Sequence, residues 1–298
     1  GRLKEKIEKA HAVLNDCRLC PRDCEVNRLA GETGICRTGE KARVSSFNAH
    51  FGEEAPLVGT KGSGTIFFKH CNLLCSFCQN YDISHEGYGE DVSTAQLAEI
   101  MLALQNTGCH NINFVTPTHV VPQILSALEK AIDKGLSVPL VYNSGGYDKP
   151  STIKLLDGVF DIYMPDFKFW SPDVAQKTCQ AADYPQTARR ALTEMHRQVG
   201  DLTTDASGIA MRGLLVRHLV LPDAMAGTRD VAGFIVNHLS ANTYVNIMSQ
   251  YRPCGRASEI KALSVPLSVS EYKTAEAMAR EEGLNRLDKR ERIVFLKP

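Results

Sequence analysis

The sequence has no excess of charge of either sign, since its 298 residues include 34 lysines and arginines and 34 aspartates and glutamates. This balance argues against a strongly basic nucleic-acid-binding protein and against an acidic solvating tail. No apolar run reaches the roughly 18 residues that span a membrane, and the charged first residues lack the apolar centre of a signal peptide. We therefore expect a cytoplasmic protein without nucleic-acid or membrane partners.

Apolar residues make up 43% of the chain, which is enough for a sizeable core. From about residue 60 onward, short apolar runs alternate with helical patterns. The continuous apolar character of the runs is typical of parallel strands that are buried on both faces. The expected strands are 65–68, 112–115, 138–142, 160–164, 214–221 and 244–248.

Helices are predicted between these strands. Ser93 and Gln96 form a predicted capping box, and a second helix is expected to begin near Pro122 and to end at Gly135. Further helices are expected near 150–156, 185–198, 228–239 and 271–282. Serial β-α units predict a parallel sheet, either open and doubly wound or closed into a full or partial barrel. Each architecture places ligands at the carboxyl ends of the strands.

Seven of the ten cysteines fall into two tight groups, which favours metal binding in a chain without a secretory signal. Cys71, Cys75 and Cys78 have the spacing C-x-x-x-C-x-x-C and follow the first expected strand. Three thiolates from one loop can ligate three irons of a cubane cluster and leave the fourth iron open. The alternative is a zinc site completed by a distant side chain such as Cys109 or His70.

The other group lies near the start of the chain and consists of Cys17, Cys20, Cys24 and Cys36. Four thiols in so short a segment can close a tetrahedral zinc site or complete a second cubane cluster. Zinc knuckles usually pair two C-x-x-C turns and only one is present here, which slightly favours the cluster. Its expected role is electron relay, or stabilisation of a segment too short to bury its own core.

Polar residues also mark the ends of the later strands. Asp166 and Lys168 follow the fourth expected strand, and Arg217 interrupts the apolar fifth strand. A buried guanidinium needs a partner, which is either the carboxylate of a bound ligand or a salt bridge inside the barrel.

The loop from Cys71 to Cys78, with the aromatic Phe77 directly before its last cysteine, resembles the radical S-adenosylmethionine (SAM) superfamily. The D-x-K pattern of Asp166 and Lys168 and the R-x-x-V-x-P pattern that begins at Arg217 resemble the pyruvate formate-lyase activating enzyme branch. The likeness is closest to the uncharacterised activating-enzyme-like iron–sulfur members of that branch.

This resemblance implies a partial six-stranded (β/α) TIM-type barrel over residues 59–255. An N-terminal helix and four-cysteine metal-binding segment would occupy 1–58, and a C-terminal helical extension 256–298. It further implies that a 4Fe–4S cluster on the three-cysteine loop binds SAM, and that one electron splits SAM to a 5′-deoxyadenosyl radical.

The radical would abstract a hydrogen atom from a glycine of a partner glycyl-radical enzyme, or alternatively from a small molecule or peptide. A flavodoxin or ferredoxin is the expected electron donor. A zinc-stabilised binding protein without catalysis is the alternative from another class.

The resemblance also assigns roles to individual residues. Phe77 would pack near the adenine of SAM. The residues that would surround its ribose, its carboxylate or an associated cation are Asn143, Asp166, Lys168 and Arg217. The superfamily often holds the amino group of SAM with Gly-Gly-Glu after the second strand. This chain departs from that pattern, and Thr116, Thr118 or His119 would accept from the amino group instead.

Overall fold

The computed structural model describes residues 2–288. Its strands are β1 (Ala42–His50), β2 (Ser63–Phe68), β3 (Glu90–Val92), β4 (Ile112–Val115), β5 (Leu140–Ser144), β6 (Ile162–Pro165), β7 (Thr203–Thr204), β8 (Ala210–Leu219), β9 (Tyr244–Met248) and β10 (Arg286–Leu287). Its α-helices are α1 (Arg2–Ala12), α2 (Ala55–Val58), α3 (Thr94–Asn106), α4 (Val121–Asp133), α5 (Pro150–Leu155), α6 (Pro172–Cys179), α7 (Tyr184–Val199), α8 (Thr228–His238) and α9 (Val269–Glu281).

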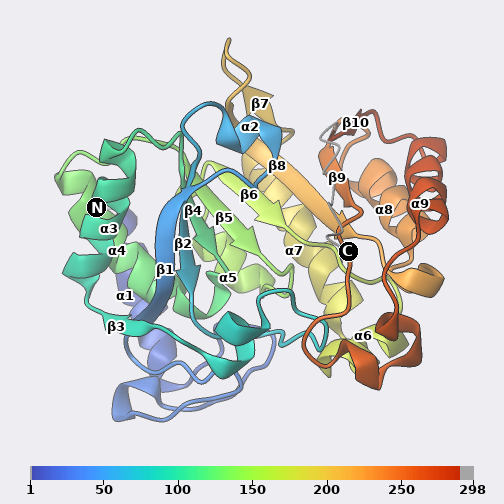
Figure 1. The fold of residues 1–298 in the computed structure, drawn as a ribbon. Coiled ribbons are helices and arrows are strands. Elements are labelled where there is room, and N and C mark those ends of the chain that lie inside the picture. Colours follow the sequence, from blue (N-terminus) through green and yellow to red (C-terminus); the bar gives the residue numbers. More distant parts are fainter. Residues whose placement is uncertain (1, 289–298) are drawn as a thin grey trace.

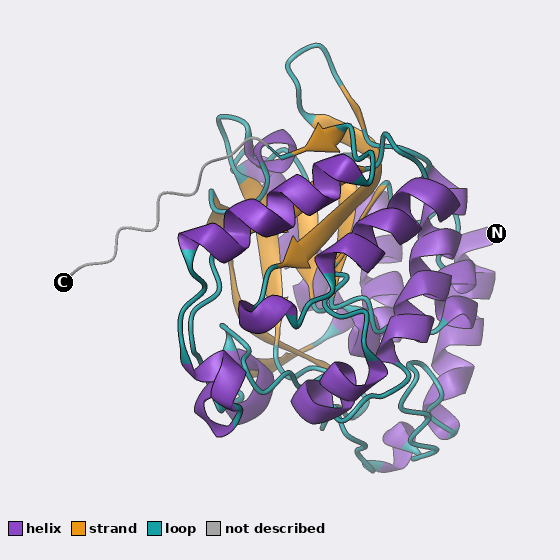
Figure 2. Cartoon of the chain, turned by 90° about the vertical axis from the view of Figure 1, so that its right-hand side faces the viewer, coloured by secondary structure: helices purple, strands orange, loops and turns teal. Residues whose placement is uncertain are grey.

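The strands form a curved central sheet that helices cover from outside (Figures 1 and 2). The order along the sheet is β10-β9-β8-β6-β5-β4-β2-β1-β3, and β7 pairs with β8 beside this path. Strands β2, β4, β5, β6, β8 and β9 pair in parallel. The predicted mostly parallel α/β fold is therefore confirmed as an open sheet, consistent with a partial TIM-type barrel.

All six predicted strands are present, and β4 and β9 have the predicted bounds. The capping box of α3 is also present, because the Ser93 side chain accepts from the Gln96 amide and the Gln96 side chain accepts from the Ser93 amide. The antiparallel edge was not predicted. It consists of β1, which pairs with β2, and β3, which pairs with β1.

The edge strand β1 belongs to the part of the chain that we expected to form a separate N-terminal segment, yet it joins the main sheet. At the other end, β10 pairs with β9 and α9 packs against α8. The domain boundaries at residues 58 and 255 stay a prediction. Residues 289–298 of the expected C-terminal extension lie outside the described residues.

Alternate residues of the parallel strands face two different cores, as the two-residue period of a strand requires. Phe114 and Tyr142 face the helices and make edge contacts with Phe160, whose ring centroid lies 5.8 and 5.0 Å from theirs. A smaller apolar cluster lies on the inner side of the sheet and includes Val141 and Leu215. The next residues in phase with these two are Asn143 and Arg217, so the strands direct polar side chains inward at their carboxyl ends.

None of the helices within residues 2–288 combines the length and the apolar character needed to cross a membrane.

The turn after β5 depends on a glycine. Gly146 has a φ of +76°, in the left-handed region that favours glycine, and a Cβ atom there would overlap the carbonyl oxygen of Asp166. Gly145 differs, because a Cβ atom at that position would make an ordinary contact 3.5 Å from the Leu73 side chain. The close approach of the β5 and β6 ends therefore requires Gly146 and tolerates a larger residue at 145.

We predict that Gly146→Ala lowers the free energy of unfolding by roughly 2 kcal/mol or more, because it adds backbone strain to a steric overlap. Urea unfolding followed by circular dichroism measures this change. Gly145→Ala is the matched control and should change the free energy of unfolding by under about 1 kcal/mol. Equal losses in the two variants would contradict the requirement for a glycine at 146.

Candidate functional site

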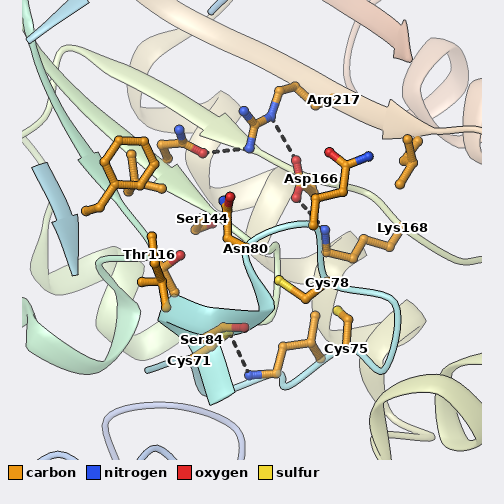
Figure 3. Close-up of a pocket in the computed structure, with 18 of the residues that line it drawn as sticks. Cys71, Cys75, Cys78, Asn80, Ser84, Thr116, Ser144, Asp166, Lys168 and Arg217 are labelled. Atoms are coloured by element: carbon orange, nitrogen blue, oxygen red, sulfur yellow. Dashed lines mark hydrogen bonds and ion pairs between the residues drawn. The ribbon is translucent and has the colours of Figure 1, made fainter. Parts of the chain in front are cut away.

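A cavity of about 330 Å³ lies at the carboxyl ends of the parallel strands. Figure 3 shows the three cysteines of the predicted cluster loop at one end of this cavity and Arg217 with Asp166 at the other. The residues proposed for SAM that line it are Phe77, Thr116, Asn143, Asp166, Lys168 and Arg217. The structure thus brings together side chains that are spread over about 150 residues of the sequence. They meet at the carboxyl ends of the strands, where the sequence predicted a ligand site.

The loop that follows β2 presents Cys71, Cys75 and Cys78 to the cavity. Left-handed backbone at His70 and Leu74, with φ of +69° and +57°, wraps the loop back on itself. The amide of Cys78 donates to the carbonyl of Cys75 at 3.1 Å, and the amide of Leu73 donates to the sulfur of Cys71 at 3.3 Å. The loop is therefore shaped by its own backbone around the three sulfurs.

The donor set fits a 4Fe–4S cluster with one open iron. Of the described residues that line the cavity, only Cys71, Cys75 and Cys78 are cysteines. Between residues 2 and 288, no group of three or more histidine, cysteine, aspartate or glutamate side chains is arranged to hold a metal ion. In a cubane cluster each thiolate binds a different iron, so the three sulfurs need not converge on one point.

Burial raises the pKa of the Cys71 thiol to about 12 and also raises that of Cys78. The pKa of Cys75 is raised by a hydrogen bond to Cys179 and by burial. Iron ligation would therefore release protons, as is usual when a metal binds cysteines.

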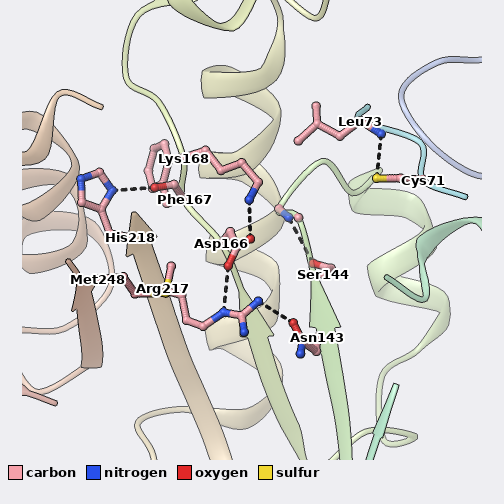
Figure 4. A network of polar contacts seen from close by, with 12 residues as sticks. Cys71, Leu73, Asn143, Ser144, Asp166, Phe167, Lys168, Arg217, His218 and Met248 are labelled. Carbon is pink, nitrogen blue, oxygen red and sulfur yellow. Dashed lines mark hydrogen bonds and ion pairs between the residues drawn. The ribbon is translucent and has the colours of Figure 1, made fainter. Parts of the chain in front are cut away.

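A buried polar network forms the opposite end of the cavity (Figure 4). The guanidinium of Arg217 donates to Asp166 at 2.8 Å and to the side-chain oxygen of Asn143 at 2.7 Å. Lys168 donates to the other oxygen of Asp166 at 2.5 Å. A second carboxylate, Glu53, lies 3.5 Å from Arg217. The predicted salt bridge inside the barrel is therefore present, and its members line the cavity.

The charges of this network stabilise one another. Burial alone would raise the pKa of Asp166, but the charges of Arg217 and Lys168 outweigh it and hold that pKa below its usual range. Burial likewise opposes the charged form of Lys168, and Asp166 outweighs this effect and raises the lysine pKa. The network thus presents fixed charges of both signs to any polar ligand in the cavity.

The three residues predicted to accept a hydrogen bond from the amino group of SAM do not lie together. Thr116 lines the cavity, whereas Thr118 and His119 are not among its lining residues. Thr118 donates to the buried carboxylate of Asp148 at 2.7 Å. The Nε2 atom of His119 bonds to the carbonyl of Lys69 at 2.9 Å. Of the three, Thr116 is the one that faces the proposed ligand.

The N-terminal cysteines line a separate cavity of about 10 Å³. Cys17, Cys20 and Cys36 are buried and Cys24 is half-buried. Burial raises the pKa of the Cys20 thiol to about 12. Gly34 leaves room for this packing, because a Cβ atom at that position would lie 2.5 Å from the sulfur of Cys24. The four predicted thiols therefore surround one small space.

Arg28 and His119, from outside the four-cysteine pattern, are among the other residues that line this small cavity. Arg28, 1% exposed, donates to the carbonyls of Gly39 at 2.7 Å and His119 at 2.9 Å, and lies 4.0 Å from the sulfur of Cys17. Its hydrogen-bond partners among the described residues include no carboxylate. The Nδ1 atom of His119, which also lines this cavity, is buried without a hydrogen-bond partner. A buried cation and a buried ring nitrogen thus accompany the thiols.

Arg22, which lies between Cys20 and Cys24, was not predicted to have a role. It donates to the carbonyls of Asn72 at 2.9 Å and Leu73 at 3.1 Å, inside the cluster loop. It also donates to the carbonyls of Cys179 at 2.8 Å and Gln180 at 2.6 Å, at the end of α6. The four-cysteine segment is therefore fastened directly to the cluster loop, a contact for which the sequence carries no local signal.

The aromatic residue of the cluster loop, Phe77, packs against other aromatic side chains. Phe77 is 4% exposed, lines the cavity and makes edge contacts with Phe169 and Tyr251 at centroid distances of 5.8 and 6.1 Å. Its predicted contact with adenine stays a prediction.

Comparisons with known proteins show the family to which the chain belongs. A family model described as the radical SAM superfamily matches residues 65–208. The uncharacterised protein MJ0674 of Methanocaldococcus jannaschii is 31% identical over 290 residues, which cover 94% of this chain and 79% of that protein. The chain belongs to the radical SAM superfamily and is a radical SAM enzyme, with the 4Fe–4S cluster and SAM that this family implies.

Two solved structures are similar to part of the chain at low sequence identity. One is a radical SAM methyltransferase from Sphaerobacter thermophilus, with a TM-score of 0.49 and 15% identity over 76% of this chain and 65% of that chain. The other is HydG, a maturase of the [FeFe]-hydrogenase, with a TM-score of 0.48 and 13% identity over 72% of this chain and 48% of that chain. The chain thus spans slightly less than two thirds and about half of these proteins.

We predict that Asp166→Asn lowers the free energy of unfolding by about 3 kcal/mol at pH 7, because it leaves the buried charges of Arg217 and Lys168 uncompensated. The pKa of Asp166 is lower in the folded protein than in the unfolded chain. The carboxylate therefore stabilises the folded protein fully at any pH above the aspartate pKa of the unfolded chain. The contribution is lost as the pH falls through the lower pKa of the folded protein. The difference between wild type and variant should therefore shrink below about pH 4.

Denaturant unfolding across this pH range measures the difference. The exposed Asp133→Asn on α4 is the control and should change stability by under about 0.5 kcal/mol. A pH-independent loss in the Asp166 variant would contradict the assigned charge pairing.

Proposed function

We propose that this radical SAM enzyme abstracts a hydrogen atom from a substrate presented at the rim of the 330 Å³ cavity, and that the substrate is a glycine in a partner glycyl-radical enzyme. The observation that carries the proposal is the size of the cavity, near the lower end of the roughly 300–1,000 Å³ of small-molecule sites. Such a space suits SAM and leaves little room for a second whole molecule. A glycine at the tip of a protein loop can be presented at the rim of the cavity and needs little space inside it.

The chain's own residues would bind and orient SAM. When bound, the reduced cluster supplies the electron that splits SAM to a 5′-deoxyadenosyl radical. Arg217 and Lys168 offer positive charge to the carboxylate of SAM, and Asp166 and Asn143 offer acceptors to its hydroxyl or amino groups. Thr116 adds a hydroxyl at the end of β4. Phe77 and its aromatic neighbours provide an apolar wall that excludes water from one side.

We also propose that Cys17, Cys20, Cys24 and Cys36 hold a second metal centre, either a zinc ion or a second 4Fe–4S cluster. Four cysteine thiolates around zinc or around a cubane cluster leave the centre with net negative charge. The buried guanidinium of Arg28 beside Cys17 supports the proposal, because a buried cation is stable only next to compensating negative charge.

We predict that Cys71→Ala abolishes release of 5′-deoxyadenosine from SAM in anaerobically reconstituted protein supplied with dithionite, because the cluster then loses one of its three protein ligands. Chromatography of the reaction mixture measures the product. Cys109→Ala replaces a buried thiol that does not line the cavity and should retain cleavage. With a candidate glycyl-radical enzyme present, the wild-type reaction should give the doublet of a glycyl radical in electron paramagnetic resonance.

Retained SAM cleavage in the Cys71 variant would contradict the cluster assignment. Cleavage by wild type without a glycyl doublet, tested against each glycyl-radical enzyme of the source organism, would contradict the partner. A modified small molecule or peptide formed in its place would identify the alternative substrate class.

We predict that the purified chain contains metal beyond the four irons of one 4Fe–4S cluster, and that Cys36→Ala removes this excess. Iron and zinc measured by mass spectrometry, together with sulfide analysis, distinguish a zinc ion from a second cluster. Cys254→Ala, outside both cysteine groups, is the matched control and should keep the full metal content. Equal metal content in all three proteins would contradict a centre at the N-terminal cysteines.

A further inference from the structure

A second large cavity, of about 410 Å³, lies on the other side of the cluster loop. His70 and Ser84, which lie on either side of the cluster loop in the sequence, line both large cavities, so the segment from 70 to 84 separates them. The remaining walls come from the four-cysteine segment, from the end of α6 and from the segment that follows β9. They include Arg37, Lys177 and Arg256. We call this space the basic cavity.

Positive charge concentrates in the basic cavity although the chain as a whole has a net charge of zero. Arginine and lysine occur four times among its described lining residues, and Glu86 is the acidic one. Arg37, Lys177 and Arg256 are exposed to solvent. The contact of Arg256 with Glu259 is 3.9 Å long and both side chains are more than half exposed, so it neutralises little of this charge.

The floor of the basic cavity touches the cluster loop. Leu74, the residue before Cys75, lines it. Cys179 also lines it, is 3% exposed, and has a side-chain hydrogen bond with Cys75. A molecule seated in the basic cavity therefore lies one side chain away from a predicted cluster ligand.

We propose that the basic cavity is the docking site of an acidic one-electron donor protein. The inference rests on the proposed function, because the cluster must gain an electron before SAM is split. The donor's cofactor loses one electron, the cluster gains it, and the chain contributes the route past Leu74 and Cys179 to Cys75. No bond forms or breaks in this step.

The position of the basic cavity leaves the other side of the loop free. SAM would occupy the 330 Å³ cavity and the substrate would lie at its rim, and the lining of this cavity includes none of Arg37, Lys177 and Arg256. The donor could therefore bind while SAM is in place. Opposite charge would also steer its encounter with the chain, an effect that weakens as ionic strength rises.

The test compares two reductants on the full chain reconstituted with iron and sulfide. One is photoreduced flavodoxin, an acidic protein with a one-electron couple, and the other is dithionite. The variant carries Lys177→Glu and Arg256→Glu. We expect its dissociation constant for flavodoxin at low ionic strength, and its flavodoxin-driven rate of 5′-deoxyadenosine release, to worsen about tenfold or more. Dithionite-driven release should stay within about twofold of wild type, because a small reductant needs no docking surface.

The matched control carries Lys4→Glu and Lys9→Glu, which make the same change of net charge on the exposed face of α1. It should bind flavodoxin and use it as wild type does. Equal behaviour of the two double variants would overturn the docking site. A proportional loss of dithionite-driven release in the Lys177 and Arg256 variant would also overturn it, because these side chains would then act on the cluster itself.

Failure of the proposed function has a separate signature. In that case wild type releases no 5′-deoxyadenosine with either reductant, whereas flavodoxin binding, followed by flavin fluorescence, still depends on salt and on Lys177 and Arg256. Binding that depends on neither salt nor these two residues would overturn the docking site alone.

Discussion

The buried charge of Arg217 determines how the carboxyl ends of three strands are arranged. Its guanidinium reaches Asp166 at the end of β6 and Asn143 in β5, and Lys168 completes the pairing of Asp166. A charge in the interior of a β/α fold is stable only with such partners. The cavity is therefore polar at this end because the fold requires it, and the same requirement leaves paired charges in contact with any ligand that enters.

The cluster loop depends on contacts with distant parts of the chain. The amide of Ser76 donates to Thr178 at 2.9 Å, and the carbonyl of Ser76 accepts from the amide of Arg256 at 2.7 Å. Arg22 holds the carbonyls on the other side of the loop. The loop also packs Leu73 and Phe77 into the main core, so apolar contacts and these hydrogen bonds together fix the positions of the three thiols. Elements from the beginning, the middle and the end of the chain thus meet at one short loop.

The sequence predicted the parts of the site that follow from the cysteine spacing and from the polar residues at the strand ends, and the structure adds the periodicity that explains their direction. The spacing of Cys71, Cys75 and Cys78 identified the cluster loop. The two-residue period of the strands, which places Asn143 in phase with Val141 and Arg217 in phase with Leu215, accounts for the inward-facing polar ends. These features depend on local geometry that every strand shares.

Other parts could not be predicted, because they depend on turn conformation or on contacts between distant segments. Thr116 has a φ of +59°, and this turn directs Thr118 and His119 away from the cavity that Thr116 faces. Nothing in the residue types required that turn. The bonds of Arg22 to Leu73 and Cys179 likewise join segments about 50 and 157 residues away.

The bonds of Arg22 make the two groups of cysteines thermodynamically linked. Folding of the four-cysteine segment orders part of the cluster loop, and an ordered cluster loop in turn favours the folded segment. Such coupling is reciprocal, so whatever binds one group strengthens binding at the other by the same factor. Assembly of the proposed centre at the N-terminal cysteines would therefore be coupled to assembly of the cluster on the three-cysteine loop.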